Sequence, residues 1–224
     1  MNDASWRKAK WYDAFHVLDA PAQLATPKTS FALVHDGANI YIAIRAEEPE
    51  PKKLSMKMVQ RDADVWADDC VEIFIDSQGK GERYYHLIIN PSGTLYDAKV
   101  VESGLVHRRE WNCGATVETH IGTTEWTVEV GVPFSDLSFD PEEPSLWRLN
   151  VARQRKVSIP AGLFTFAPLT GTLHRPENFA VAKLSDADLS PFLLDVVKGQ
   201  VRLYPKQGEM LAEVKTEELS RAHS

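Results

Sequence analysis

Residues 61–78, RDADVWADDCVEIFIDSQ, join an acidic turn that carries one Trp to a strand of alternating side chains. Glu72 and Phe74 fall on one face of that strand. Three aliphatic side chains share the opposite face: Val71, Ile73 and Ile75. One face can therefore enter an apolar core while the other presents a carboxylate beside an aromatic ring.

Trp66 stands at the entrance of this strand, six residues before Glu72. This pair suits a polar ring as ligand, because an aromatic face covers sugar C–H groups while a carboxylate accepts hydrogen bonds from hydroxyls. A Trp in front of a buried strand could instead plug the core or its rim, since Trp is highly buried on average. Spacing alone leaves both interpretations open.

The composition is that of an ordinary globular protein, with 43% hydrophobic and 25% charged residues among 224. The formal net charge of -7 disfavours binding to nucleic acid or to an anionic membrane, because both require a basic surface. No apolar run reaches the length of a membrane span, and the N-terminal segment lacks the apolar core of a signal peptide. We therefore expect a chain that is cytoplasmic or has lost a leader.

Turn signals divide most of the chain into short β-rich runs. Three hairpin connections are predicted, at residues 35–37, 91–93 and 122–124. Further strands are predicted at residues 147–155, 163–168 and 179–184. Helix-like segments are short and cover residues 134–137 and 186–197, and the polar, proline-rich EEPEPKK at 47–53 is expected to be a surface loop.

Strands at this density predict an all-β fold, an antiparallel two-sheet β-sandwich with short helical turns. We expect one domain over residues 1–204, followed by a charged C-terminal tail at 205–224. Trp126 and the alternate residues after it are expected to point into the sandwich from one strand face.

The order of these segments resembles carbohydrate-binding modules of family 9. The pieces that carry the resemblance run from about residue 30 to residue 184: HDGANIYIAIRAEEP, VWADDCVEIFID, YYHLIINPSGTLYD, EWTVEVGVPFSDL, LWRLNVARQR and HRPENFAVAKL. The W-x-D-D-x-V-E-I-F-I-D block together with V-E-V-x-V-P-F-x-x-L is its specific part. The resemblance implies a two-sheet sandwich without catalysis, an extracellular or periplasmic setting, and recognition of sugar ends between aromatic side chains.

Three residues match binding positions that the resemblance implies. Trp66 matches the first aromatic of the sugar clamp. Glu72 matches the acid expected to bond sugar hydroxyls, and Asn90 matches a polar residue at the end of the following strand. The resemblance therefore predicts Trp66, Glu72 and Asn90 as ligand-binding residues.

Other positions depart from the family pattern. Ile88 stands where a basic residue is expected, and Leu173 and His174 stand where the second aromatic of the clamp should be. Family members that resemble this chain at HRPENF carry a His there, which makes His174 a candidate ligand group. His86 is a second candidate, and both histidines could instead be ordinary polar surface groups.

Two acids and one arginine have both a structural and a binding interpretation. Asp68 and Asp69 could bind calcium, which occurs in related modules, or cap the turn, which their spacing favours. Arg153 shares a face with apolar residues. It is therefore either a ligand group at the sheet rim or a buried ion-paired residue, with Asp62, Asp69 or Glu129 as partner.

The two cysteines, Cys70 and Cys113, permit one disulfide at most and fit no closed zinc site. We expect two free thiols, because an isolated pair in a domain of this size is usually unpaired. The chain contains no CxxCH, which excludes covalent c-type haem attachment.

Three classes of function compete, and we expect the first, non-catalytic binding of a saccharide or polysaccharide. The second is a b-type haem electron-transfer domain, for which Met56, Lys57 and Met58 are potential ligands. The third is a glycoside hydrolase, which needs two carboxylates beside a scissile bond, such as Asp69 and Glu72.

Overall fold

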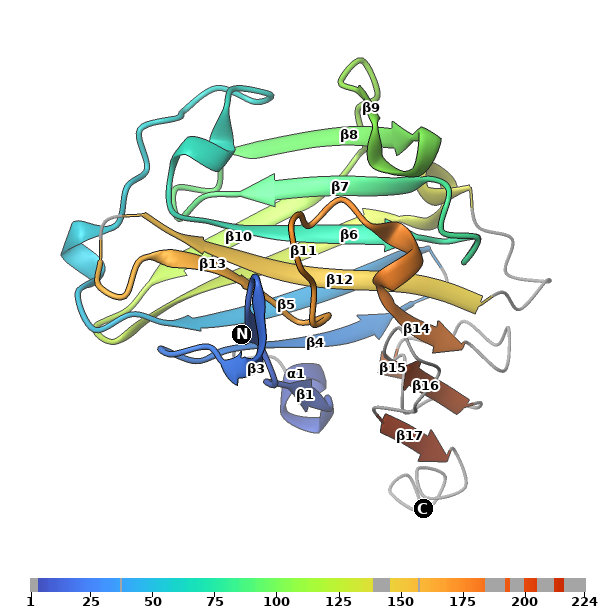
Figure 1. Ribbon diagram of the computed structural model, residues 1–224, viewed down its shortest axis with the longest axis horizontal. Coiled ribbons are helices and arrows are strands. Elements are labelled where there is room, and N and C mark those ends of the chain that lie inside the picture. The colour runs from blue at the N-terminus through green and yellow to red at the C-terminus, as the bar shows by residue number, and fades with distance from the viewer. Residues whose placement is uncertain are drawn as a thin grey trace.

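Two antiparallel β-sheets lie against each other in the computed structural model of the protein (Figure 1). The described residues are 4–36, 38–138, 146–156, 158–183, 192–193, 200–204 and 212–215. The predicted two-sheet sandwich is therefore confirmed. No helix in these residues is long and apolar enough to cross a membrane.

The first sheet runs in the order β1, β4, β5, β11 and β10, and β15 also pairs with β4. Its strands are β1 (Trp11–Tyr12), β4 (Thr29–His35), β5 (Asn39–Glu47), β10 (Thr116–Ile121), β11 (Glu125–Pro133) and β15 (Phe192–Leu193). The hairpins predicted at 35–37 and 122–124 are confirmed as the β4–β5 and β10–β11 connections.

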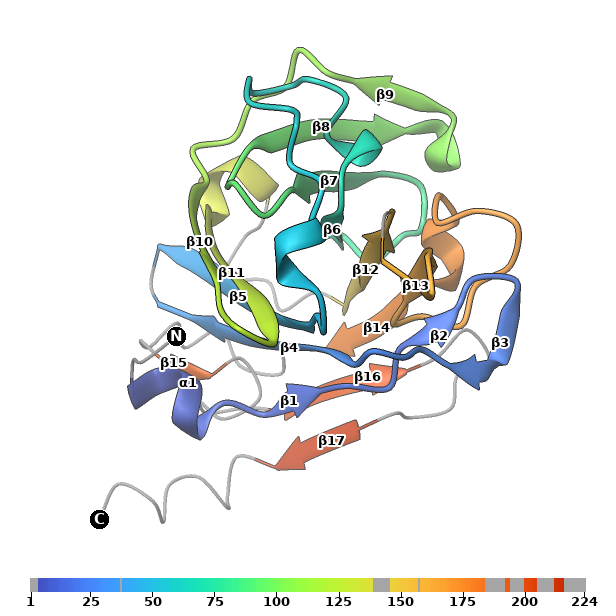
Figure 2. The same cartoon turned by 90° about the vertical axis from the view of Figure 1, so that its left-hand side faces the viewer.

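The second sheet runs in the order β17, β16, β14, β12, β6, β7, β8 and β9, so that β9 and β17 lie at opposite ends (Figure 2). β13 pairs with β12, β2 with β13, and β3 with β2. The bounds are β2 (His16–Val17), β3 (Ala20–Leu24), β6 (Cys70–Asp76), β7 (Tyr84–Ile89), β8 (Leu95–Val101), β9 (Val106–Arg108), β12 (Leu146–Arg155), β13 (Gly162–Thr165), β14 (Ala180–Lys183), β16 (Gln200–Tyr204) and β17 (Ala212–Lys215).

Helical segments in the described residues are short. They are α1 (Ala4–Lys8) and the single turns η1 (Pro51–Lys53), η2 (Val65–Ala67), η3 (Glu102–Gly104), η4 (Phe134–Leu137) and η5 (Pro176–Asn178). The predicted turn at 134–137 is confirmed as η4. The helix-like segment predicted at 186–197 lies outside the described residues except for β15, and β17 falls within the segment predicted as a charged tail.

The main core fills the space between the two sheets. Trp126 and three valines alternate along β11 and are all at most 1% exposed, which confirms their predicted inward face: Val128, Val130 and Val132. From the second sheet, β6 contributes the aliphatic face predicted from its alternation: Val71, Ile73 and Ile75. Period-two alternation on both sheets therefore builds one continuous apolar core.

Smaller clusters pack on the outer face of the second sheet. Phe74 on β6 lies in a cluster with Tyr84 and Phe179, beneath the chain between β13 and β14. Cys70 lies in another, with Ile88, Tyr96 and the partly buried Trp66. Cys70 and Cys113 are both buried free thiols, as expected. The outer face is thus partly covered, and the uncovered part holds the site described below.

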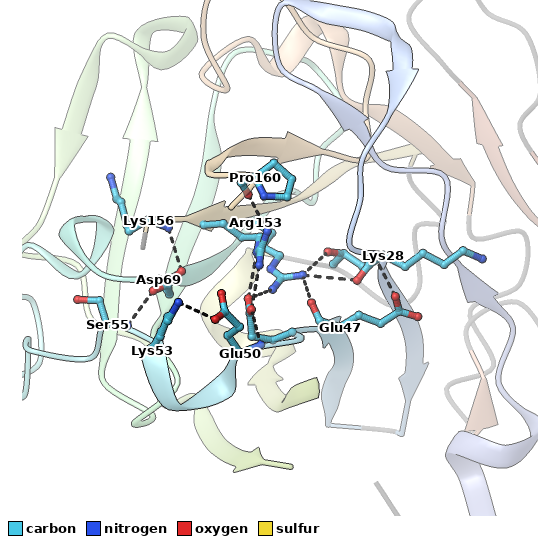
Figure 3. Close-up of polar contacts among 12 residues, drawn as sticks. Lys28, Glu47, Glu50, Lys53, Ser55, Asp69, Arg153, Lys156 and Pro160 are labelled. Carbon is cyan, nitrogen blue, oxygen red and sulfur yellow. Dashed lines mark hydrogen bonds and ion pairs between the residues drawn. The ribbon is translucent and has the colours of Figure 1, made fainter. Parts of the chain in front are cut away.

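The segment EEPEPKK is not entirely a surface loop, because Glu48 is fully buried. Its carboxylate accepts hydrogen bonds from Arg153 at 3.1 Å and from Arg155 at 2.8 Å. Figure 3 shows the adjoining contacts, in which an Arg153 N–H donates to the Glu47 carbonyl oxygen at 2.8 Å. Of the two interpretations of Arg153, the structure therefore supports the buried, ion-paired residue. Its partner is Glu48, and the three partners predicted from sequence are wrong.

Candidate functional site

A cavity of about 610 Å³ opens on the outer face of the second sheet. Its lining comes from β6 to β9 and the residues that flank β9, and from η2. The remainder comes from Leu18 and Leu163 beside β2 and β13, and from residues 171–174. The lining residues are Leu18, Trp66, Glu72, His86, Ile88, Tyr96, Leu105, His107, Arg109, Leu163, Gly171, Thr172, Leu173 and His174. This volume lies within the range of cavities that bind small molecules.

Strand register sets the floor of the cavity. Glu72 on β6 pairs with Ile88 on β7, which in turn pairs with Tyr96 on β8. Because directly paired residues project to the same face of a sheet, these three side chains stand in one row on the outer face. His86 stands in the next row, opposite Phe74, and the two rings stack at 4.3 Å between centroids.

Glu72 and His86 form a buried pair in the middle of this floor. Nε2 of His86 donates to Oε2 of Glu72 at 2.8 Å, and the two residues are 2% and 6% exposed. The bond fixes the position of the carboxylate. An ionised carboxylate has about four acceptor sites, so Glu72 retains capacity for ligand hydroxyl groups.

Three imidazole rings meet beside this pair. The His174 ring lies 4.7 Å from the His107 ring and 5.3 Å from the His86 ring, measured between centroids, both edge to face. His107 comes from β9, whereas His174 comes from the segment before η5. The fold therefore brings together three histidines that are far apart in the sequence.

These surroundings keep His174 neutral. Burial, together with the nearby His86 and His107, lowers the pKa of His174 to about 3. The Tyr84 hydroxyl lies 2.6 Å from Nδ1 of His174, and burial raises the pKa of Tyr84. Tyr84 therefore remains protonated, and its hydroxyl and Nδ1 of His174 share one hydrogen bond. A neutral imidazole has one N–H donor and one acceptor nitrogen, so the nitrogen of His174 that Tyr84 does not bond can still bond a ligand hydroxyl group.

Trp66 forms one wall of the cavity from η2. It is half-buried, and its ring packs edge to face against Tyr96 at 5.2 Å. The Arg109 guanidinium lies 5.0 Å from the centre of the Trp66 ring, and an ion pair of 3.8 Å joins Arg109 to Asp64. Since both partners of this ion pair are largely exposed, it holds Arg109 only weakly.

The structure brings four of the predicted ligand residues to this cavity: Trp66, Glu72, His86 and His174. Arg153 lies in the buried ion cluster instead. Asn90 is fully buried, and its Nδ2 donates to the Met58 carbonyl oxygen at 2.8 Å. Oδ1 of Asn90 accepts a bond from the Thr94 backbone N–H at 3.0 Å. Asn90 therefore organises the β7–β8 turn and does not line the cavity.

Asp68 and Asp69 also anchor loops. The Asp68 oxygens accept bonds from the Ser55 hydroxyl and the Met58 backbone N–H, at 2.7 Å and 2.8 Å. The Asp69 oxygens accept from the backbone N–H groups of Ser55 and Lys156, at 2.8 Å and 2.9 Å (Figure 3). All four oxygens thus face N–H or O–H donors, so this pair does not fit a calcium site.

Elsewhere in the described part of the chain, no group of three or more His, Cys, Asp or Glu residues is placed to hold a metal ion. The methionines considered as haem ligands lie outside the cavity lining. Met56 is 41% exposed, and Met58 packs in the cluster with Trp66.

Sequence reasoning missed Tyr96, His107 and Arg109 as cavity residues. Tyr96 could have been found from its strand alternation, because it lies two residues before Ala98 on the outer face of β8. The short strand β9 carries no such signal, since only its pairing with β8 places His107 beside His86 and His174.

The family model described as carbohydrate family 9 binding domain-like matches residues 1–162 of the chain. A search of curated proteins found no match.

Similar solved structures include a protein from Bacteroides uniformis that is provisionally described as carbohydrate-binding. Its TM-score is 0.65 at 16% identity, over 80% of this chain and 87% of that one. A carbohydrate-binding module of family 9 from Caldicellulosiruptor kristjanssonii in complex with glucose gives a TM-score of 0.58 at 15% identity, over 79% and 83% of the two chains. A family 9 module from the same organism in complex with cellotriose gives 0.52 at 14% identity, over 74% and 75%. At these identities, the similarity shows the fold.

Proposed function

Because the chain belongs to the carbohydrate family 9 binding domain-like family, we propose that it is a non-catalytic module that binds a saccharide in the outer-face cavity. The observation that carries this proposal is the meeting of Trp66 with Glu72 and His174 around one cavity. An aromatic wall covers the C–H face of a sugar ring, while the carboxylate and the imidazole form hydrogen bonds with its hydroxyl groups. The ligand is therefore a neutral saccharide.

The ligands of similar modules support this choice of ligand class. Two of the similar solved structures contain glucose and cellotriose. Their identity to this chain is too low to transfer individual contacts, so the class alone is carried over. Ile88 and Leu173 occupy positions where the family pattern expects a basic residue and an aromatic residue. We expect weaker and less selective binding than in modules that have a complete clamp.

The number of carboxylates at the cavity supports a binding role without catalysis. Glycoside hydrolysis ordinarily uses two carboxylates on either side of the scissile bond, about 5 to 9.5 Å apart. Among the described residues that line the cavity, Glu72 is the only carboxylate, and it accepts a hydrogen bond from His86. Asp69, the second acid considered from sequence, bonds the Ser55 and Lys156 backbones instead.

A glycan array followed by titration calorimetry tests the proposal. The purified chain should bind one or more neutral mono- or oligosaccharides, and the same saccharides should remain intact after prolonged incubation. If the chain binds no glycan on the array, and calorimetry detects no binding at millimolar saccharide, saccharide binding is contradicted. Release of reducing ends in step with protein concentration would contradict the non-catalytic role.

A further inference from the structure

Aliphatic side chains stand at both edges of the cavity, outside the polar centre formed by Glu72, His86 and His174. Leu18 and Leu163 lie at the edge formed by β2 and β13, where the Leu18 N–H donates to the Leu163 carbonyl oxygen at 2.9 Å. Leu105 lies at the opposite edge, immediately before β9. A saccharide alone has little use for such edges, because its hydroxyl groups seek polar partners there.

Leu105 is the most accessible of these residues, with 81% of its surface exposed. A single exposed leucine is common on protein surfaces, but this one lines the cavity. The turn before it is conformationally unusual, because Glu102 and Ser103 have φ values of 54° and 53°. Consecutive non-glycine residues in this region store strain, which tends to occur at functional sites.

The same turn packs against the segment that carries His174. Gly104 has a φ of 98°, and a Cβ atom at this position would lie only 2.5 Å from the His174 carbonyl oxygen. A glycine is therefore required for the turn to approach the His174 backbone so closely. This contact fixes Leu105 relative to His174, so that an aliphatic side chain stands next to the polar centre.

We propose that the natural ligand is a glycoside with an apolar aglycone, whose sugar occupies the polar centre and whose aglycone lies against Leu105. This inference rests on the proposed saccharide binding. A cavity of about 610 Å³ is in the range of those that enclose drug-sized ligands, so it has room for a sugar and a substituent. Removing the aglycone and the Leu105 side chain from water together supplies affinity that a free sugar lacks.

Calorimetry with matched glycosides tests this inference. The probes are the methyl and octyl β-glycosides of glucose, galactose and mannose, each kept below its micelle-forming concentration. The chain should bind the octyl form of its preferred sugar at least tenfold more tightly than the methyl form. Leu105→Ser should bring that ratio to within about threefold of one. Leu24→Ser, a matched change at a 62% exposed leucine that does not line the cavity, should keep the full ratio.

The outcomes separate this inference from the proposal on which it rests. Equal affinities for a methyl and octyl pair would overturn the aglycone inference while saccharide binding stands. An octyl preference that Leu105→Ser leaves intact would overturn the assignment to Leu105. No binding of any of the six glycosides by folded protein would overturn the aglycone inference, and an empty glycan array as well would overturn the saccharide proposal. Thermal melts of both serine variants confirm that they are folded.

Discussion

His174 shows how a single residue acquires its chemistry from the fold. In the sequence it is a histidine in the place of a clamp aromatic, and nothing there indicates its protonation. In the structure it lies between His86, His107 and the Tyr84 hydroxyl, and its pKa is lowered to about 3. Its neutral form is therefore a property of the assembled site, and sequence could not predict it.

The lowered pKa of His174 predicts a pH-dependent stability. An unfolded histidine titrates near pH 6.5, so between about pH 3 and 6.5 the unfolded chain binds a proton that the folded chain does not. Stability should therefore fall as pH falls below 6.5, and should be insensitive to His174 above that. Urea unfolding of His174→Gln from pH 4 to 8 should show a shallower loss on the acid side. Parallel profiles for the variant and the unmodified chain would contradict the neutral, buried state of His174.

Thr172 offers the position for a second aromatic wall. Leu173, the position indicated by the sequence, is only 3% exposed and packs in the cluster with Phe74, so a Trp there would overfill that cluster. Thr172 lines the same cavity and is half-buried. Thr172→Trp should strengthen saccharide binding about twofold to twelvefold, since an aromatic contact is worth about 0.5–1.5 kcal/mol. Calorimetry measures the gain, and unchanged or weaker affinity would show that residue 172 does not face the sugar.

At the scale of elements, the end of β5 and the end of β12 are joined by buried charges. Glu48 follows β5, and Arg153 and Arg155 end β12. The polar composition of EEPEPKK concealed this contact, because a carboxylate that bonds two guanidinium groups is indistinguishable in sequence from a solvated one. The alternation of β12 did place Arg153 on the inner face. Its partner comes from the other sheet, and sequence spacing carries no information about that pairing.

Glu48→Ala should destabilise the protein by about 3–5 kcal/mol, because it leaves two buried guanidinium groups without their carboxylate. Glu50→Ala removes the nearby exposed Glu50–Lys53 ion pair and should cost less than about 1 kcal/mol. Chemical unfolding of both variants at pH 7 compares them directly. A loss for Glu48→Ala as small as that for Glu50→Ala would mean that the buried cluster contributes little to stability.

The contribution of the buried Glu48–Arg153–Arg155 cluster to stability also depends on pH. Burial by itself raises the pKa of Glu48, but the hydrogen bonds from Arg155 and from the Glu50 backbone N–H, together with the charges of Arg155 and Arg153, outweigh burial and hold that pKa below its usual range. Its stabilising contribution is complete above the pKa of an unfolded glutamate and is lost as the pH falls through the lowered value.

Across the whole molecule, period-two alternation was sufficient to predict the sandwich. Hydrophobic alternation in β6 and β11 identified the inner faces, and the turn residues marked three hairpins. The candidate site was predictable for Glu72 from the alternation of β6, and for Trp66 and His174 from the family resemblance. Residues brought in by loops and short strands, such as His107 and Leu105, depend on contacts between distant segments.

Val130 tests the register on which this architecture depends. It is 1% exposed on β11 and faces the main core between the sheets. Val130→Asp places a carboxylate among apolar side chains without a partner and should prevent folding. Glu129→Asp, at the next position of the same strand, keeps its charge and serves as the control. Circular dichroism and gel filtration report the result, and a soluble, native-like Val130→Asp protein would show that the register is wrong.

The most direct measurement of the central claim is a paired titration of Trp66→Ala and Trp11→Ala with the best saccharide from the array. Both tryptophans are half-buried beneath an arginine, but Trp11 packs on the outer face of the other sheet, with Arg45 at 4.3 Å. Trp66→Ala should lose detectable binding while it retains a cooperative melt, and Trp11→Ala should bind like the unmodified chain. Undiminished binding by folded Trp66→Ala would place the saccharide elsewhere and contradict the account.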